Sequence, residues 1–356
     1  MKNIYQETLI TTLKEKIHVI AEKAVALQYK VHPGVWEKYG LEGKQKSIRD
    51  MIYHLEFLIE SIATEDTAIF QEYIIWLREL FQSINIPEGE IELSLNSIHQ
   101  MAKEYVTEEE LSILNTYIKP AKEVLKRSIY KTASHIDEKN SLTPLTKQYI
   151  DALLNNDRHR ASFLILEAAN KDISIRDIYL YVFQVSQYEI GRLWMTNKIS
   201  VAQEHYCTAA TQLIMSQLYS HIFSNEKNGY TLIAFCIDNE LHEIGIRMVA
   251  DFFEIEGWDT YYYGANTPFH SAISTIQDIN PDLVAISATL ASNASKVSTL
   301  IETIRSINTK ENLKIMVGGR LFNISRDLWK KFKADGYASD AESAVQMGNI
   351  LVGVHT

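Results

Sequence analysis

Residues 230–237, Tyr-Thr-Leu-Ile-Ala-Phe-Cys-Ile, form a short and almost unbroken apolar run. A run of this length that ends at polar residues predicts a strand buried on both faces, as in a parallel sheet covered by helices. Further apolar runs follow at 282–287 and 313–317, and segments with helical periodicity separate them. Short strands that alternate with helices predict an α/β layer built on a parallel sheet.

We therefore expect a five-stranded, parallel, Rossmann-like sheet over residues 229–356, with helices on both faces. The expected strands are residues 230–237, 258–263, 282–287, 313–317 and 336–338. The expected helices are residues 246–255, 269–279, 294–308, 323–333 and 341–351.

Two helical segments precede this sheet. Residues 1–135 read as an all-helical domain, with helices expected at 4–29, 46–62, 68–81, 87–105 and 107–135. Apolar residues there recur at intervals of three and four, which is typical of one buried helix face. A polar stretch at 134–144 predicts a linker, and residues 145–225 predict a four-helix bundle with helices near 146–155, 157–170, 174–194 and 199–223.

Composition limits the function. The formal net charge is −10, so a broad attraction to nucleic-acid backbones is not expected. Cys207 and Cys236 are the only cysteines, which favours two buried thiols in a reducing cytoplasm over a disulfide or a zinc cluster. The first twenty residues carry frequent charges and predict no signal peptide. No run of eighteen apolar residues occurs, so no membrane span is expected.

Polar residues follow the first strand at once, in the order Asn-Glu-Leu-His-Glu-Ile-Gly from 239 to 245. Ligands of open α/β sheets gather at the carboxyl ends of strands, where His242 is expected. Glu240 is near enough to accept a hydrogen bond from one imidazole nitrogen and leave the other for a metal. Gly245 lets a large group approach the start of the helix. A histidine in such a loop can also be only a helix cap or a surface residue.

Two later signals stand at fixed distances from this loop. Forty-one residues (246 to 286) separate Gly245 from Ser287, in the sequence Ser-Ala-Thr-Leu that closes the third strand. Twenty-seven residues (291 to 317) separate Leu290 from Gly318, and Gly318 and Gly319 close the fourth strand. All three signals fall at strand ends.

This set resembles the cobalamin-binding module of methionine synthase, corrinoid mutases and B12-dependent photoreceptors. The resemblance implies that His242 replaces the dimethylbenzimidazole of the cofactor and binds cobalt from below. Glu240 stands where aspartate is usual, a departure shared with the photoreceptor branch. The cofactor-binding residues that the resemblance implies are Glu240, Leu241, Glu243, Ile244, Gly245, Gly264, Ser287, Thr289, Leu290, Gly318, Gly319 and Tyr337.

A second constellation lies in the expected bundle. Trp194 is followed by nine residues (195 to 203) and then by Glu204 and His205. This spacing resembles that of the cobalamin-dependent light-sensing repressors. The resemblance implies that Trp194, Val201, Glu204 and His205 surround the adenosyl group above the corrin ring. Those repressors place a histidine after the tryptophan, and here Met195 stands there, which puts a light-state histidine ligand at that position in doubt. Alternatively, Trp194 closes the bundle and Glu204 and His205 form a solvated helix turn.

The stretch Phe-Gln-Glu-Tyr-Ile-Ile-Trp-Leu-Arg at 70–78 resembles the helical domain that precedes the cobalamin module in the photocobilins. That resemblance implies a globin-like or phycobiliprotein-like fold that binds biliverdin. Residues 1–135 contain no cysteine, so a bilin would be held without a thioether bond. Trp36, Tyr73 and Trp76 are conceivable pocket walls, although such a stripe is usually core.

The sequence thus predicts a light sensor that uses adenosylcobalamin, with biliverdin as a second chromophore, and that acts as a homo-oligomer or through an unknown protein partner. The alternative from the enzyme class is a corrinoid carrier for methyl transfer, with an open upper face. A third reading is a non-catalytic interaction module that signals to another protein.

Overall fold

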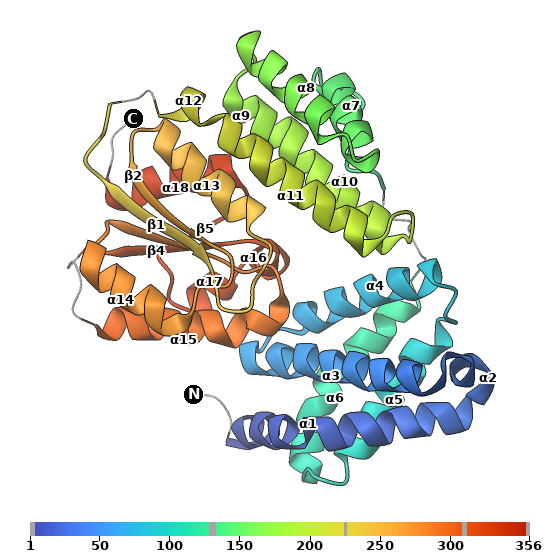
Figure 1. The fold of residues 1–356 in the computed structure, drawn as a ribbon. Helices are drawn as coiled ribbons and strands as arrows, with labels where there is room; N and C mark the ends of the chain where they lie inside the picture. Colours follow the sequence, from blue (N-terminus) through green and yellow to red (C-terminus); the bar gives the residue numbers. More distant parts are fainter. Residues whose placement is uncertain (1–3, 128–132, 224–225, 308–311, 354–356) are drawn as a thin grey trace. The chain divides into compact units, whose positions relative to one another are not determined.

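The computed structural model describes residues 4–127, 133–223, 226–307 and 312–353. The chain forms two compact units, residues 1–129 and residues 130–356. Each unit has its own hydrophobic core, so the two are described separately (Figure 1).

The described part of the first unit is helical. Its elements are α1 (Ile4–Val31), α2 (Pro33–Trp36), η1 (Glu37–Tyr39), α3 (Gly40–Thr64), α4 (Thr67–Ser83), α5 (Gly89–Ala102) and α6 (Glu108–Leu125). Asp66 caps α4, and Thr107 with Glu110 forms a capping box at the start of α6.

The expectation of a helix from 107 to about 135 was wrong. Helix α6 ends at Leu125, residues 133–142 contain no helix, and residues 128–132 lie outside the described part. Arg78 of α4 explains the end point, because its Nη1 atom donates to the carbonyls of Val124 and Arg127 at 3.3 and 2.9 Å. These carbonyls belong to the helix end, where a helix leaves its acceptors unpaired.

The second unit begins with helices that pack around one core. They are α7 (Thr143–Leu154), α8 (Arg158–Asn170), α9 (Ile175–Asp177), η2 (Ile178–Phe183), α10 (Gln184–Met195), α11 (Val201–Gln217) and α12 (Tyr219–Ile222). The helix expected at 174–194 is present as α9, η2 and α10, and its central six residues are a π-helix. The helix expected at 199–223 is interrupted at Leu218.

The sheet follows these helices. Its strands are β1 (Thr231–Cys236), β2 (Asp259–Gly264), β3 (Leu283–Ser287), β4 (Lys314–Gly318) and β5 (Gly336–Ala338). All pairs are parallel and the order is β2-β1-β3-β4-β5, which confirms the five-stranded parallel sheet. The connections are α13 (Ile244–Ile255), α14 (Phe269–Ile279), η3 (Ala291–Asn293), α15 (Ala294–Ser306), α16 (Arg320–Ile324), α17 (Leu328–Lys331) and α18 (Ala341–Val352). Helices α13 and α18 cover one face, and α14 and α15 the other (Figure 1).

The single helix expected at 323–333 was wrong. Two short helices, α16 and α17, occupy this region, with a break at residues 325–327. Leu321 and Phe322 of the first and Leu328 of the second are all fully buried. The turn between the two helices brings all three side chains into the interior.

The strand register places the expected site residues side by side. Cys236 of β1 pairs with Ser287 of β3, and Ser287 pairs with Gly318 of β4. The carboxyl ends of β1, β3 and β4 therefore lie next to one another. Within the described residues, no helix is long and apolar enough to cross a membrane.

Candidate functional site

His242 lies in the loop between β1 and α13, at the point where the strand order reverses. Strand β1 has β2 on one side and β3 on the other. After β1 the chain crosses to β2 on one side, and after β3 it crosses to β4 on the opposite side. Crevices at such switch points are the usual ligand sites of open α/β sheets. The side chain of His242 is 59% exposed there.

Glu240 holds the imidazole of His242. The Nδ1 atom of His242 lies 2.5 Å from Glu240 Oε1, which leaves Nε2 as the nitrogen that can bind a metal. The backbone amide of His242 also donates to Oε1 at 3.1 Å. Glu240 itself is fully buried. The spacing of Glu240 and His242 in the sequence predicts this hydrogen bond. The structure adds that the carboxylate of Glu240 lies inside the protein.

The second oxygen of Glu240 ties the histidine loop to the end of β3. Its Oε2 atom accepts the backbone amides of Thr289 and Leu290, both at 2.8 Å, and the side-chain amide of Asn293 at 3.4 Å. One carboxylate thus fixes two of the three predicted motifs to each other.

These contacts shift both pKa values. Burial opposes the charge of Glu240, but the hydrogen bonds from His242 and from the Leu290 and Thr289 amides lower its pKa to about 2. The hydrogen bond to Glu240 raises the pKa of His242, against burial, and the carboxylates of Glu240 and Glu204 raise it further. An imidazole held by a full negative charge is a more basic metal ligand.

The residues after β3 and β4 form a close-packed pair of loops. Gly319 has φ +93°, and a Cβ on it would lie 2.4 Å from the Ala288 carbonyl oxygen. Gly318 stands next to Ala338, whose carbonyl oxygen would lie 3.1 Å from an added Cβ. Only glycine fits at Gly319 without displacing backbone. Tyr337 lies on β5 and donates its hydroxyl to Asn323 of α16 at 2.7 Å.

Gly264, at the end of β2, leaves room for a side chain of the histidine loop. The space that its side chain would take is filled by Glu243, whose Oε2 atom would lie 2.9 Å from an added Cβ. Gly245 has open space around it, as a backbone that a large group approaches requires. Ile244 is the first residue of α13 and is half-buried.

The residues predicted above the corrin ring lie at the junction of α10 and α11. Trp194 is half-buried in the last turn of α10, and Val201, Glu204 and His205 lie in the first turns of α11. The Nδ1 atom of His205 lies 2.6 Å from Glu204 Oε2.

Large apolar side chains in the histidine loop and after β3 are exposed. Leu241 is 72% exposed and Leu290 38%, and Val201 at the start of α11 is 51% exposed. Exposed apolar groups beside a histidine with a fixed Nδ1 atom suit a large, flat, mainly apolar ring with a metal at its centre. The residues present therefore fit the cofactor that the resemblance implies.

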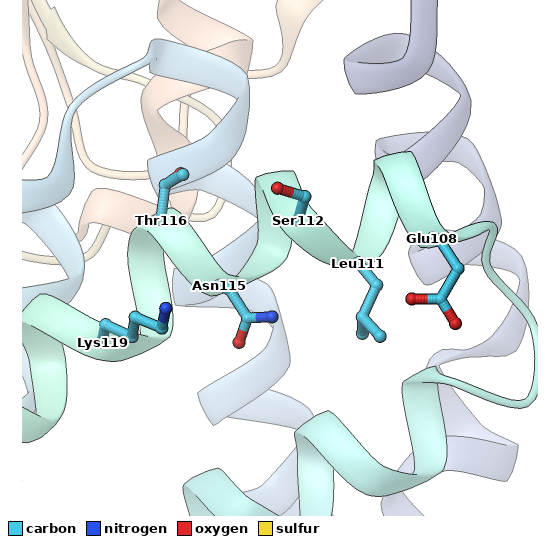
Figure 2. Close-up of a pocket in the computed structure, with 6 residues that line it drawn as sticks. All are labelled: Glu108, Leu111, Ser112, Asn115, Thr116 and Lys119. Carbon is cyan, nitrogen blue, oxygen red and sulfur yellow. The ribbon is translucent and has the colours of Figure 1, made fainter.

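Two hollows on the surface contain none of the predicted residues. Figure 2 shows the first, a polar depression along α6 that is lined by Glu108, Leu111, Ser112, Asn115, Thr116 and Lys119. The second lies between the η2–α10 segment and the start of α18, and is lined by Leu180, Tyr181, Gln184, Val185, Asp340, Glu342, Ser343 and Gln346.

Sequence patterns did not identify Asn293 or Gln212 as part of the site. Asn293 is buried and donates to Glu240, and Gln212 of α11 donates to Glu243 at 2.9 Å. A single asparagine or glutamine in a helical segment carries no spacing signal, so only the fold brings these two to the loop. Trp36 and Tyr73, conceivable bilin pocket walls, are buried and already paired, Trp36 with Glu90 and Tyr73 with His54.

Three family models match segments of the chain. Two family models described as B12 binding domain match residues 230–346 and 145–219, and a model described as Phycobilisome protein matches residues 7–125.

Several corrinoid proteins match part of the chain. A corrinoid protein of Desulfitobacterium hafniense is 20% identical over 207 residues, which is 57% of this chain and 94% of the relative. The dimethylamine corrinoid protein of Methanosarcina barkeri is 24% identical over 167 residues, 47% of this chain and 75% of the relative. The solved monomethylamine corrinoid protein of Methanosarcina barkeri shares the fold with a TM-score of 0.53 and 18% identity, over 60% of this chain and all of that one. Two segments of the chain, residues 145–219 and 230–346, are therefore similar to B12 binding domains.

Proposed function

We propose that this protein holds a corrinoid whose cobalt is bound from below by Nε2 of His242. The observation that carries the proposal is the buried carboxylate of Glu240, which fixes Nδ1 of an exposed imidazole at 2.5 Å and is itself held by two backbone amides. Gly318 and Gly319 would border the nucleotide tail, together with Ser287, Thr289, Leu290 and Tyr337. Leu241 and Leu290 would contact the ring.

Replacing His242 by alanine tests this assignment. We expect the wild-type protein to bind cobalamin with an imidazole nitrogen on cobalt, visible as nitrogen hyperfine splitting in the EPR spectrum of the cobalt(II) form. His242→Ala should lose this splitting and bind at least about tenfold more weakly. His270, which is exposed at the start of α14, offers a matched control. Unchanged spectra in His242→Ala would refute the assignment.

A bound corrinoid supplies a cobalt–carbon bond that can pass on or release its upper group, and two uses of that bond are open. The first is a carrier for methyl groups. The comparisons support it better than light sensing, because the named relatives are corrinoid proteins of dimethylamine and trimethylamine systems. The chain itself would then supply the lower ligand and leave catalysis to a partner enzyme.

The second use is light sensing, with adenosylcobalamin and a bilin. A specific observation favours it: residues 7–125 match a phycobilisome family model, and the corrinoid relatives align over 57% of the chain or less. In this reading Trp194, Val201, Glu204 and His205 cover the adenosyl group. Loss of that group would change the contacts of α10 and α11, and with them the oligomer or a contact with a partner protein.

Titration of the dark, full-length protein with adenosylcobalamin and methylcobalamin separates the two uses. A sensor should prefer the bulky adenosyl group, and illumination should change its sedimentation coefficient. A carrier should bind methylcobalamin at least as well and should sediment identically in the dark and after light.

A further inference from the structure

Four polar residues of α11 follow one another at intervals of four: Glu204, Thr208, Gln212 and Ser216. Residues four apart are neighbours on a helix, so these side chains form one inclined row along its surface. Thr208 donates its hydroxyl to Glu204 at 3.1 Å, and Ser216 donates to the Gln212 carbonyl, also at 3.1 Å. This polar row runs from the first turn of α11 to its last.

The far half of the polar row is fastened to α13. The side-chain amide of Gln212 donates to Glu243 Oε1 at 2.9 Å. One turn along α13, the guanidinium of Arg247 donates to the Gln212 carbonyl at 3.0 Å and to Ser216 Oγ at 2.7 Å. Arg247 is 7% exposed, Gln212 is half-buried and Ser216 is exposed, so the seam is buried on the side of α13.

Glu243 is also fastened on the side of the sheet. Its Oε2 atom accepts the hydroxyl of Tyr262 at 2.7 Å and the backbone amide of Ala265 at 3.0 Å. Because Glu243 directly follows His242 in the chain, α11 is joined to the histidine loop through one rigidly held carboxylate.

The near half of the polar row leads to the residues proposed above the ring. Glu204 stands two helical turns before Gln212 and is bonded to Thr208 at 3.1 Å and to His205 at 2.6 Å. A stiff helix that is fixed at Gln212 therefore also fixes how far Glu204 and its neighbour His205 stand from His242.

We infer that Gln212, through its hydrogen bond to Glu243, sets the space above the cobalt and so determines which size of upper ligand the site accepts. The inference rests on the proposed function, in which the corrin ring lies between His242 and the first turn of α11. Gln212 touches neither the ring nor the reacting bond and acts as a positioning residue.

The test compares the dissociation constants of adenosylcobalamin and methylcobalamin, measured in the dark by absorption on the full-length protein. Gln212→Met keeps the length of the side chain and removes the bond to Glu243. We expect the ratio of the two constants to change by about fivefold or more, as the loss of one hydrogen bond allows. The nitrogen splitting from His242 should remain.

Ser162→Ala is the matched control, because it removes a hydrogen bond to Gln217 of the same helix that comes from α8 and not from α13. It should leave the ratio unchanged. Ser216→Ala removes the second contact of the seam and should change the ratio in the same direction as Gln212→Met, which keeps the test valid if the latter does not fold. An unchanged ratio in the folded seam variants would overturn the inference. Failure of the wild-type protein to bind cobalamin through His242 would instead refute the proposed function.

Discussion

Glu240 carries a buried negative charge that accepts hydrogen bonds from several donors. Removing this charge should therefore lower the stability of the fold. Glutamine keeps the shape, but in either orientation its NH2 group would face donors, which are the backbone amides of Thr289 and Leu290 or the amide and imidazole of His242. We expect Glu240→Gln to lower the free energy of unfolding at pH 7 by about 2–3 kcal/mol and to weaken cobalamin binding about 10–100-fold.

Urea unfolding and absorption titration measure the two effects of Glu240→Gln. Asp238→Asn is the control, since Asp238 is 40% exposed and lies 3.8 Å from Lys296, and it should cost at most about 0.5 kcal/mol. Equal losses in both variants would show that the position of Glu240 is not special.

Asp251 of α13 predicts a pH dependence of stability. Burial and, to a smaller extent, Glu254 raise its pKa to about 6, although the hydroxyl of Tyr179 and the charge of Arg247 favour the ionised form. Between the unfolded value of 3.8 and about 6 the folded protein binds the extra proton, so stability falls as pH rises through this window and the full cost is present at pH 8.

Asp251→Asn should remove that cost. Its side-chain oxygen can still accept the hydroxyl of Tyr179, which lies 2.8 Å from Asp251 Oδ2. We expect the variant to be more stable than the wild type at pH 8 by about 1–3 kcal/mol and to match it near pH 4. Thermal unfolding at several pH values measures the difference, and parallel curves for the two proteins would contradict the assignment.

At the scale of elements, the sheet could be predicted because its inner strands β1, β3 and β4 are buried on both faces. Runs such as residues 283–287 contain apolar side chains at nearly every position, and each observed strand lies within about a residue or two of the expected one. The ends of helices were harder. Helix α6 ends where Arg78, forty-six residues earlier in the chain, donates to the carbonyl of Val124. The break after Ile324 depends on the packing that buries both Phe322 and Leu328.

The residues of the candidate site also divide into those that the sequence predicts and those that it does not. His242, Ser287 and Gly318 could be predicted because each stands at the end of an apolar run, and the three motifs are separated by fixed numbers of residues. Gln212 and Asn293 could not, since a contact across the seam or beneath a loop depends on the packed structure and not on a repeat. The role of Gly264, which makes room for Glu243, is likewise visible only in three dimensions.

The loops after β3 and β4 give a prediction at this scale. Gly319→Ala would place a methyl group against the Ala288 carbonyl and force a side chain into φ +93°. We expect a loss of about 1–3 kcal/mol in the free energy of unfolding. Gly245→Ala is the control, because nothing lies within 4 Å of its added Cβ, and it should leave stability unchanged or raise it by up to about 1 kcal/mol. A harmless Gly319→Ala would mean that these loops adapt freely.

At the scale of the whole molecule, the proposal assigns one cofactor to each of the two units. In the first unit His54 is fully buried, which lowers its pKa to about 4, and its Nδ1 atom lies 2.6 Å from the Tyr73 hydroxyl. The ring of Tyr73 stacks on Phe57 at 4.0 Å. This neutral, aromatic interior lies in the segment that matches the phycobilisome model.

We expect the full-length protein to bind biliverdin in this first unit, with a red-shifted absorption band and induced circular dichroism. The only two cysteines are Cys207 and Cys236, both buried in the second unit, so acid denaturation should release all of the pigment. His242→Ala should lose its cobalamin and keep the bilin bands, because the histidine belongs to the other unit. Absence of induced circular dichroism in the wild type would remove the bilin from the proposal and leave the methyl carrier as the better account, whereas bilin bands that vanish together with cobalamin would show that the two sites depend on each other.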